Sequence, residues 1–368
     1  MSNAFRDLLR KVGSGTHTGE NLNRVEAAAA TRMMLLAEAT PAQIGAFLIA
    51  HRIKRPTGEE LAGMLDAYDE LGPKLQPINS PRPVIVLGIP YDGRSRTAPV
   101  SPLTALLLTA VGQPLVMHGS DRMPTKYGLP LVEMWQGLGV DWTGLSLAQT
   151  QQVLETTGMG FVYLPQHFAQ AQRIFEYRDQ IGKRPPFATM ELMWCPYAGD
   201  AHIISGFVHP PTENMFQVAF ALRGTSNFTT VKGLEGSCDL PRERTAIIGL
   251  SSPSTAHETA IAPIERLLLV PRDYGFASNN VPLNSTPELV EDMQAVLQGK
   301  PSELMQTAIW NGGFYLWRSG FCSDMPSGIA KAEALFTSGE VAQKLQEISQ
   351  VVSSISPQRE MPLILNGP

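Results

Sequence analysis

The pattern of apolar positions is helical through the first part of the chain. Between residues 5 and 75, apolar residues recur three and four positions apart, and the alanine- and leucine-rich stretch 24–36 favours helix. Thr40-Pro41 and Thr57-Gly58 precede two of these stretches, as N-cap residues do. The pattern predicts a separate all-helical N-terminal domain of about four helices, which we assign to residues 1–76.

A proline-rich segment then changes the pattern. Residues 72–83 carry four prolines, and we assign 77–83 as a linker and 84–368 as a second domain. From residue 84 onward, short apolar runs alternate with helical stretches, which is typical of an α/β domain with a central, largely parallel sheet flanked by helices. The predicted strands are 84–87, 114–117, 160–164, 202–208, 217–222 and 245–248, the helices between them include 103–110 and 131–137, and the part after residue 286 is helical again.

The composition is that of an ordinary globular protein, with 368 residues, 43% hydrophobic and 17% charged. The sequence has no apolar stretch of membrane-spanning length, and its start lacks the features of a signal peptide, so we expect a cytoplasmic protein without membrane contact. The three cysteines lie far apart and are expected to be reduced thiols. A net charge of −5 gives no general attraction to nucleic acid, although a local basic patch can still exist.

A glycine-containing loop follows the first predicted strand. It reads Gly88-Ile89-Pro90-Tyr91-Asp92-Gly93. Glycines let backbone N–H groups approach phosphate oxygens closely, whereas Pro90 removes one donor. Farther along, Ser101-Pro102 either binds phosphate at a helix start or is a plain N-cap followed by a first-position proline. Lys126 is a further candidate phosphate ligand.

A family resemblance is carried by residues 39–54, 88–93, 118–119 and 178–184 and by the helix around Asn311-Gly312. In this order along the chain, these segments resemble the anthranilate phosphoribosyltransferase family, which includes relatives that phosphorolyse pyrimidine nucleosides. The resemblance implies transfer of a phosphoribosyl group from phosphoribosyl pyrophosphate to an aromatic amine or related acceptor. In such catalysis the protein positions the two substrates and stabilises the charge of the transition state, and its side chains take little part in covalent chemistry.

The resemblance also implies the binding residues. His118 and Arg178 would lie at the acceptor, because a guanidinium suits a planar carboxylate. The alternatives are a structural histidine and an arginine on a helix surface. The nine-residue segment 188–196 keeps only Pro196 of a family motif, so we expect the acceptor pocket to have a changed lining. The residues implied for phosphoribosyl pyrophosphate are Gly88, Asp92, Gly93, Ser101, Gly119, Ser120 and Lys126.

The resemblance further implies Mg²⁺, held in the family by an Asp-Glu pair. At the matching place, 225–230, this chain has no carboxylate, and Thr229-Thr230 stand where the pair would be. Glu235 and Asp239 are the remaining candidate ligands, since Mg²⁺ takes carboxylate oxygens. The alternative is that both belong to a solvated turn.

Two other functions stay open. One is a non-catalytic binding protein, because a subset of the family with similarly altered motifs binds nucleic acid as homodimers, and the other is a regulatory protein without catalysis. The basic residues that could meet a phosphate backbone are Arg82, Arg94, Arg96, Arg122 and Lys126. The resemblance also implies a homodimer through the helical domain, for which the apolar residues Met33, Leu36, Phe47 and Leu48 are candidates, unless they form that domain's own core.

Overall fold

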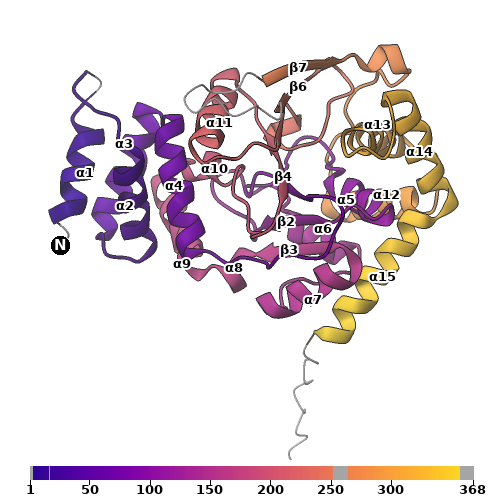
Figure 1. Cartoon of the computed structure of the whole chain (residues 1–368), viewed down its shortest axis with the longest axis horizontal. Coiled ribbons are helices and arrows are strands. Elements are labelled where there is room, and N and C mark those ends of the chain that lie inside the picture. The colour runs from indigo at the N-terminus through magenta and orange to yellow at the C-terminus, as the bar shows by residue number, and fades with distance from the viewer. Residues whose placement is uncertain (1–2, 16, 252–263, 357–368) are drawn as a thin grey trace, which may run out of the picture.

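A helical bundle lies beside a larger α/β domain in the computed structural model, which describes residues 3–15, 17–251 and 264–356 (Figure 1). The outermost residues that we assigned to the two domains, 1–2 and 357–368, lie outside these ranges. Capping boxes at Thr40 and Thr57 start two of the bundle helices, as the sequence predicted. The described part of the bundle consists of α1 (Asn3–Gly13), α2 (Arg24–Leu35), α3 (Pro41–Lys54) and α4 (Gly58–Leu71).

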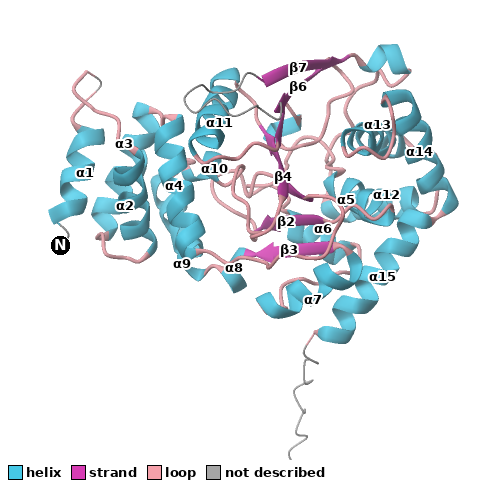
Figure 2. Ribbon diagram, viewed as in Figure 1, coloured by secondary structure: helices cyan, strands magenta, loops and turns pink. Residues whose placement is uncertain are grey.

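The second domain is built on a seven-stranded sheet with the order β3-β2-β1-β4-β5-β6-β7 (Figure 2). The first five strands are parallel to one another, while β6 and β7 are antiparallel. The fold class predicted from the sequence is confirmed. The strands are β1 (Val84–Gly88), β2 (Leu115–Gly119), β3 (Met159–Tyr163), β4 (Ala201–Gly206), β5 (Phe228–Val231), β6 (Ala246–Ser251) and β7 (Ile264–Leu269).

Helices cover both faces of the sheet. One core cluster joins a sheet face to α5, α6 and α12–α15, and a second cluster joins the other face to α9, α10, α11 and the bundle. The remaining elements are α5 (Ser101–Ala110), α6 (Leu131–Gly137), α7 (Leu147–Thr157), α8 (Leu164–His167), α9 (Ala169–Ile181), α10 (Phe187–Met190), α11 (Pro210–Leu222), α12 (Thr286–Leu297), α13 (Glu303–Arg318), α14 (Met325–Ser338) and α15 (Glu340–Ile355), with short 3₁₀ turns at Leu234–Gly236 and Pro271–Tyr274.

One predicted strand was wrong. Residues 217–222 form the end of α11, and the buried residues Phe216, Ala219 and Phe220 follow helical spacing. A short apolar run fits a buried strand or a buried helix equally well, so this run did not distinguish them. The strands β5 and β7 were not predicted. β7 carries charged residues and has mostly exposed or half-buried positions, so it lacks the apolar run on which we relied.

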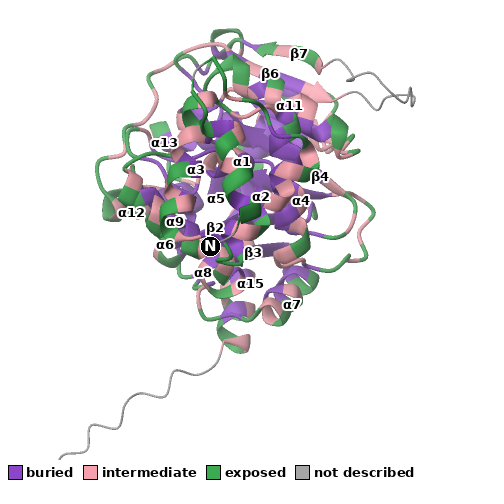
Figure 3. Cartoon of the chain, turned by 90° about the vertical axis from the view of Figure 1, so that its left-hand side faces the viewer, coloured by how far each residue is buried: buried purple, intermediate pink, exposed green. Residues whose placement is uncertain are grey.

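The junction between the domains is packed. Leu75 is buried, and its N–H donates to the carbonyl of Pro196, which ties the segment after α4 to the α/β domain. Phe47 and Leu48, two of the proposed dimer residues, belong to the buried core, whereas Leu36 is 39% exposed. In Figure 3 the exposed residues of the bundle lie on its outer faces. Among the described helices, none combines the length and apolar character needed to cross a bilayer.

Candidate active site at the carboxyl edge of the sheet

A cavity opens where the chain changes the direction in which it adds strands. β1 and β4 are parallel neighbours, but the chain continues from β1 to β2 on one side and from β4 to β5 on the other. Ligands of open α/β sheets bind at the carboxyl ends of the strands beside such a switch point. A cavity of 320 Å³ lies there, and the loops after β1 and β4 line it with Pro90, Tyr91, Asp92, Phe207, Val208 and His209.

The glycines of the loop after β1 serve packing and turn geometry. A Cβ at Gly88 would lie 1.8 Å from the carbonyl oxygen of Leu192, and Gly93 has a φ of +71°, which favours glycine. Asp92 is 4% exposed, lines the cavity and accepts a hydrogen bond from Arg184 at 3.0 Å. Of these three predicted phosphate-binding residues, Asp92 belongs to the cavity lining, whereas Gly88 and Gly93 do not.

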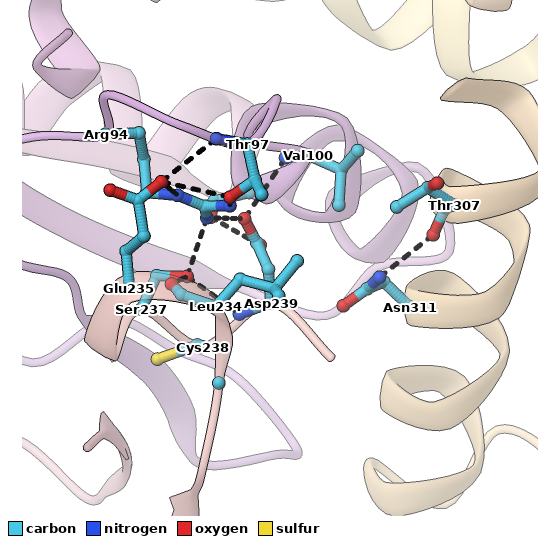
Figure 4. Close-up of polar contacts among 12 residues, drawn as sticks. Arg94, Thr97, Val100, Leu234, Glu235, Ser237, Cys238, Asp239, Thr307 and Asn311 are labelled. Atoms are coloured by element: carbon cyan, nitrogen blue, oxygen red, sulfur yellow. Dashed lines mark hydrogen bonds and ion pairs between the residues drawn. The ribbon is translucent and has the colours of Figure 1, made fainter. Parts of the chain in front are cut away.

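Beside the cavity, a buried cluster of ion pairs joins the loop before α5 to the loop after β5 (Figure 4). Arg94 is 2% exposed, and it donates from Nη1 to Asp239 at 2.7 Å and from Nε to Glu235 at 3.4 Å. Lys126 Nζ lies 2.5 Å from Glu235, and Ser101 Oγ donates to Asp239 at 2.7 Å. We call these five residues the Arg94 cluster.

The candidate metal ligands Glu235 and Asp239 therefore have their oxygens bound already. Glu235 also accepts the N–H groups of Arg96 and Thr97, both at 3.0 Å, and Asp239 accepts that of Val100 at 3.2 Å. Burial alone would raise the pKa of Glu235, but the neighbouring cations and N–H groups lower it below its usual range. Among the residues that the structure describes, no group of three His, Cys, Asp or Glu side chains is placed to hold a metal ion. This arrangement does not fit a protein site for Mg²⁺.

Thr229 and Thr230, at the position matched to the family's metal pair, lie inside β5 and are fully buried. Thr229 Oγ1 is 2.9 Å from His202 Nε2, and Thr230 donates to Glu213 at 2.6 Å. The strand reaches its carboxyl end only at Val231, and the loop beyond it carries Glu235 and Asp239. Residues 229–230 are not part of the cavity lining, and the replacement of the family's Asp-Glu pair at these positions stays a prediction.

His118, Gly119 and Ser120 lie at the end of β2 and outside the cavity lining. His118 is fully buried, and its Nδ1 is 2.5 Å from the hydroxyl of Tyr91. Burial lowers the pKa of His118 to about 3, so the ring is neutral. Ser120 is 1% exposed and donates to Gln172 at 3.1 Å. This arrangement matches the alternative of a structural histidine, and the ligand roles predicted for the three residues stay predictions.

The other two predicted phosphate ligands are engaged within the Arg94 cluster. Ser101 is the first residue of α5, while the N-cap is Val100 without a capping side chain, so the plain N-cap alternative for Ser101 was wrong. Lys126 donates to the carbonyl of Gly93 at 2.7 Å and keeps 22% of its side chain exposed. Both residues stabilise the loops around the cavity, whatever they bind.

Arg178 lines the cavity, as expected of an acceptor-binding residue, but it is buried and paired with Glu191. The alternative of a helix-surface arginine was wrong. Sequence reasoning missed Glu191, although a single carboxylate inside the apolar run 190–194 is a readable signal. It also missed Arg52 and Arg184, which line this cavity and a neighbouring one of 690 Å³, so the two cavities share a basic rim.

Most basic residues proposed for a nucleic-acid backbone are engaged within the chain. Arg94 and Lys126 belong to the Arg94 cluster. Arg122 pairs with Glu133 at 2.6 Å, and Arg82 donates to the carbonyl of Ser319. Arg96, with 77% of its side chain exposed, remains available to solvent.

Fold and site together define a two-domain α/β protein whose charged cleft lies at the switch point of its sheet and beside a helical bundle. Two family models match the chain: "Glycosyl transferase family, helical bundle domain" over residues 6–72 and "Glycosyl transferase family, a/b domain" over residues 92–342. The chain belongs to this glycosyl transferase family. The resemblance that we drew from the sequence motifs is thereby confirmed at the level of the family.

Relatives named anthranilate phosphoribosyltransferase align over nearly the whole chain. The one from Azorhizobium caulinodans is 26% identical over 355 residues, covering 96% of this chain and 98% of the relative. The one from Afipia carboxidovorans is 27% identical over 351 residues, covering 94% and 98%. Among solved structures, anthranilate phosphoribosyltransferase from Saccharomyces cerevisiae in complex with PRPP and Mg superposes with a TM-score of 0.78 at 17% identity, covering 96% of this chain and 99% of that one. This last likeness concerns the fold.

Proposed function

We propose that this chain is a phosphoribosyltransferase, which transfers a phosphoribosyl group from phosphoribosyl pyrophosphate to an aromatic amine or related acceptor. Full-length similarity to relatives of that name supports the reaction class. The observation that carries the proposal is the cavity at the switch point between β1 and β4, where open α/β sheets bind their ligands.

The charges around the cavity support an anionic sugar substrate. Arg52 and Arg184 lie on the rim shared by the two cavities, and both side chains are exposed. Exposed guanidinium groups at a concave site attract phosphate groups and can bind them through paired N–H donors. Arg184 Nη1 contacts Asp92 at 3.0 Å, which fixes its position at the cavity while more than half of its side chain stays accessible.

In this proposal, Mg²⁺ is bound by the substrate and not by side chains of the protein. Glu235 and Asp239 are bound within the Arg94 cluster, so the protein itself offers them to no metal in this arrangement. Mg²⁺ is commonly held chiefly by substrate phosphates and water. An ion carried by the pyrophosphate is therefore compatible with this cleft.

The test is calorimetric titration of the purified protein with phosphoribosyl pyrophosphate, with and without Mg²⁺. We expect saturable binding that weakens at least tenfold in Arg184→Ala. The matched control is Arg173→Ala, which removes an exposed arginine of α9 outside the cavity lining. Absence of binding under both conditions, or equal weakening in both variants, would contradict the proposal. A short DNA duplex titrated at low and moderate salt tests the non-catalytic alternative, because phosphate-backbone binding is strongly salt-dependent.

A homodimer through the helical domain remains part of the proposal. Val25 is 77% exposed and Leu36 is 39% exposed, both on the bundle. Light scattering of the wild type and of Val25→Glu tests this interface. A monomeric wild-type protein would contradict it.

A further inference from the structure

The wall of the cavity contains a guanidinium and a carboxylate that bind each other. Arg178 from α9 and Glu191 just after α10 both line the cavity, and their side chains are 1% and 2% exposed. Arg178 Nη2 donates to Glu191 Oε1. The guanidinium also lies over the ring of Phe175, 4.9 Å from its centroid. Arg178 is therefore fixed, and the carboxylate that it binds comes from the chain itself.

The interior of the cavity already carries several negative charges. Asp92, Glu191 and Glu235 all line it, and the side chain of each is less than 5% exposed. Each is paired with a cation, which is Arg184, Arg178 and Lys126 respectively. Arg52, which forms no ion pair among the described residues, stands at the rim rather than inside. A ligand carboxylate placed deep in the cavity would meet like charges and find the inner cations occupied.

The titration of Glu191 agrees with this geometry. Burial raises the pKa of Glu191 to about 7, Arg178 opposes that shift, and the charge of Asp92 adds to it. The local environment thus disfavours even the negative charge that is already present and paired. A second carboxylate beside Arg178 would be disfavoured further.

We propose that Glu191 sets the acceptor class of this cleft. It occupies Arg178 as a ligand carboxylate would, so the acceptor is an aromatic nitrogen compound without a carboxylate. This inference rests on the proposed function, which it makes more specific. Glu191 is a specificity residue here, because it acts by occupying Arg178 and not by taking part in bond changes.

The test compares two ligands that differ in one group, anthranilate and 2-aminobenzamide, in which a neutral amide replaces the carboxylate. Fluorescence titrations are run with and without phosphoribosyl pyrophosphate on the wild type, Glu191→Gly and Glu191→Gln. We expect the wild type to bind 2-aminobenzamide at least tenfold more tightly than anthranilate. In Glu191→Gly, Arg178 loses its partner, and the affinity for anthranilate should rise at least tenfold. The control Glu176→Gln, at an exposed position of α9, should keep the wild-type preference.

Folding of the variants is controlled separately. Glu191→Gly leaves Arg178 buried without its partner, so circular dichroism and thermal melting accompany each titration. If this variant fails to fold, the inference is tested with Glu191→Gln and with the double variant Arg178→Met/Glu191→Leu. The first should gain anthranilate affinity, while the second, without either charge, should bind 2-aminobenzamide but gain nothing for anthranilate.

The outcomes separate this inference from the proposed function. A wild type that prefers anthranilate, or folded Glu191→Gly and Glu191→Gln variants that gain no anthranilate affinity, would overturn the inference, even when phosphoribosyl pyrophosphate binds normally. If neither probe binds the wild type or any folded variant, the inference is also overturned. If the wild type prefers 2-aminobenzamide and Glu191→Gly gains anthranilate affinity, but phosphoribosyl pyrophosphate does not bind, the result supports the ligand class and refutes the transferase.

Discussion

Replacing Arg94 by methionine tests whether the Arg94 cluster holds the loops of the cleft together. Arg94 is 2% exposed and joins Asp239 at 2.7 Å to Glu235 at 3.4 Å. Removing one partner of a buried ion pair costs about 3–5 kcal/mol of unfolding free energy, because a charge stays behind without compensation. Glu235 keeps Lys126, and Asp239 keeps Ser101. We therefore expect Arg94→Met to lower the unfolding free energy by about 3 kcal/mol, the lower end of this range.

Arg96→Met is the matched control, because it makes the same substitution two residues away. The Arg96 side chain is 77% exposed and lies 3.8 Å from Glu235. Exposed pairs of this kind contribute about 0–1 kcal/mol. Urea unfolding of the two variants and the wild type measures the difference. If Arg94→Met and Arg96→Met cost the same free energy, the Arg94 cluster does not stabilise these loops as we infer.

Arg94→Met also tests whether Glu235 and Asp239 can bind Mg²⁺. With the guanidinium gone, Asp239 and Glu235 lose their shared cation, and added Mg²⁺ should raise the unfolding midpoint of Arg94→Met more than that of the wild type. Equal stabilisation of both proteins by Mg²⁺ would mean that the ion binds elsewhere or that the carboxylates were accessible from the start.

The remaining predictions concern the bundle and the end of β1. Burial alone would raise the pKa of Glu60, but His51 and neighbouring donors lower it from 4.5 to about 2. A depressed pKa contributes stability that is fully present above about pH 4.5 and is lost as the pH falls towards 2. Across this window the wild type should therefore lose about 3 kcal/mol more unfolding free energy than Glu60→Gln. Gly88→Ala places a Cβ 1.8 Å from the Leu192 carbonyl oxygen and should destabilise by about 3 kcal/mol in urea unfolding, whereas Gly144→Ala, with nothing within 4 Å, should be nearly neutral; equal effects would refute the packing argument.

Local signals in the sequence predicted most of the fold. Thr40 and Thr57 start helices because an N-cap needs only residues three positions away, and these contacts form as expected. The parallel strands β1 and β2 were readable as short buried apolar runs. Residues 217–222 failed because both a strand and a helix can bury such a run, and the surrounding elements decide between them.

The candidate site was predicted less completely, since its residues act through partners that are distant in the chain. Arg94 and Asp239 are 145 residues apart, and no local pattern indicates that they pair. Gly88 and Ser101 stand where the family motif suggested, yet contacts with Leu192 and Asp239 explain their presence without a ligand. Motif position alone therefore did not separate ligand binding from packing.

The sequence by itself determined the family, the helical bundle and the mostly parallel sheet, because apolar periodicity, caps and motif order are encoded by near neighbours. Only the tertiary structure decided which charged residues face the cavity and which are already neutralised. Arg178 illustrates the difference, since the sequence presented it as a free guanidinium and the fold pairs it with Glu191. Electrostatic pairing depends on distance in space, and that distance exists only once the chain has folded.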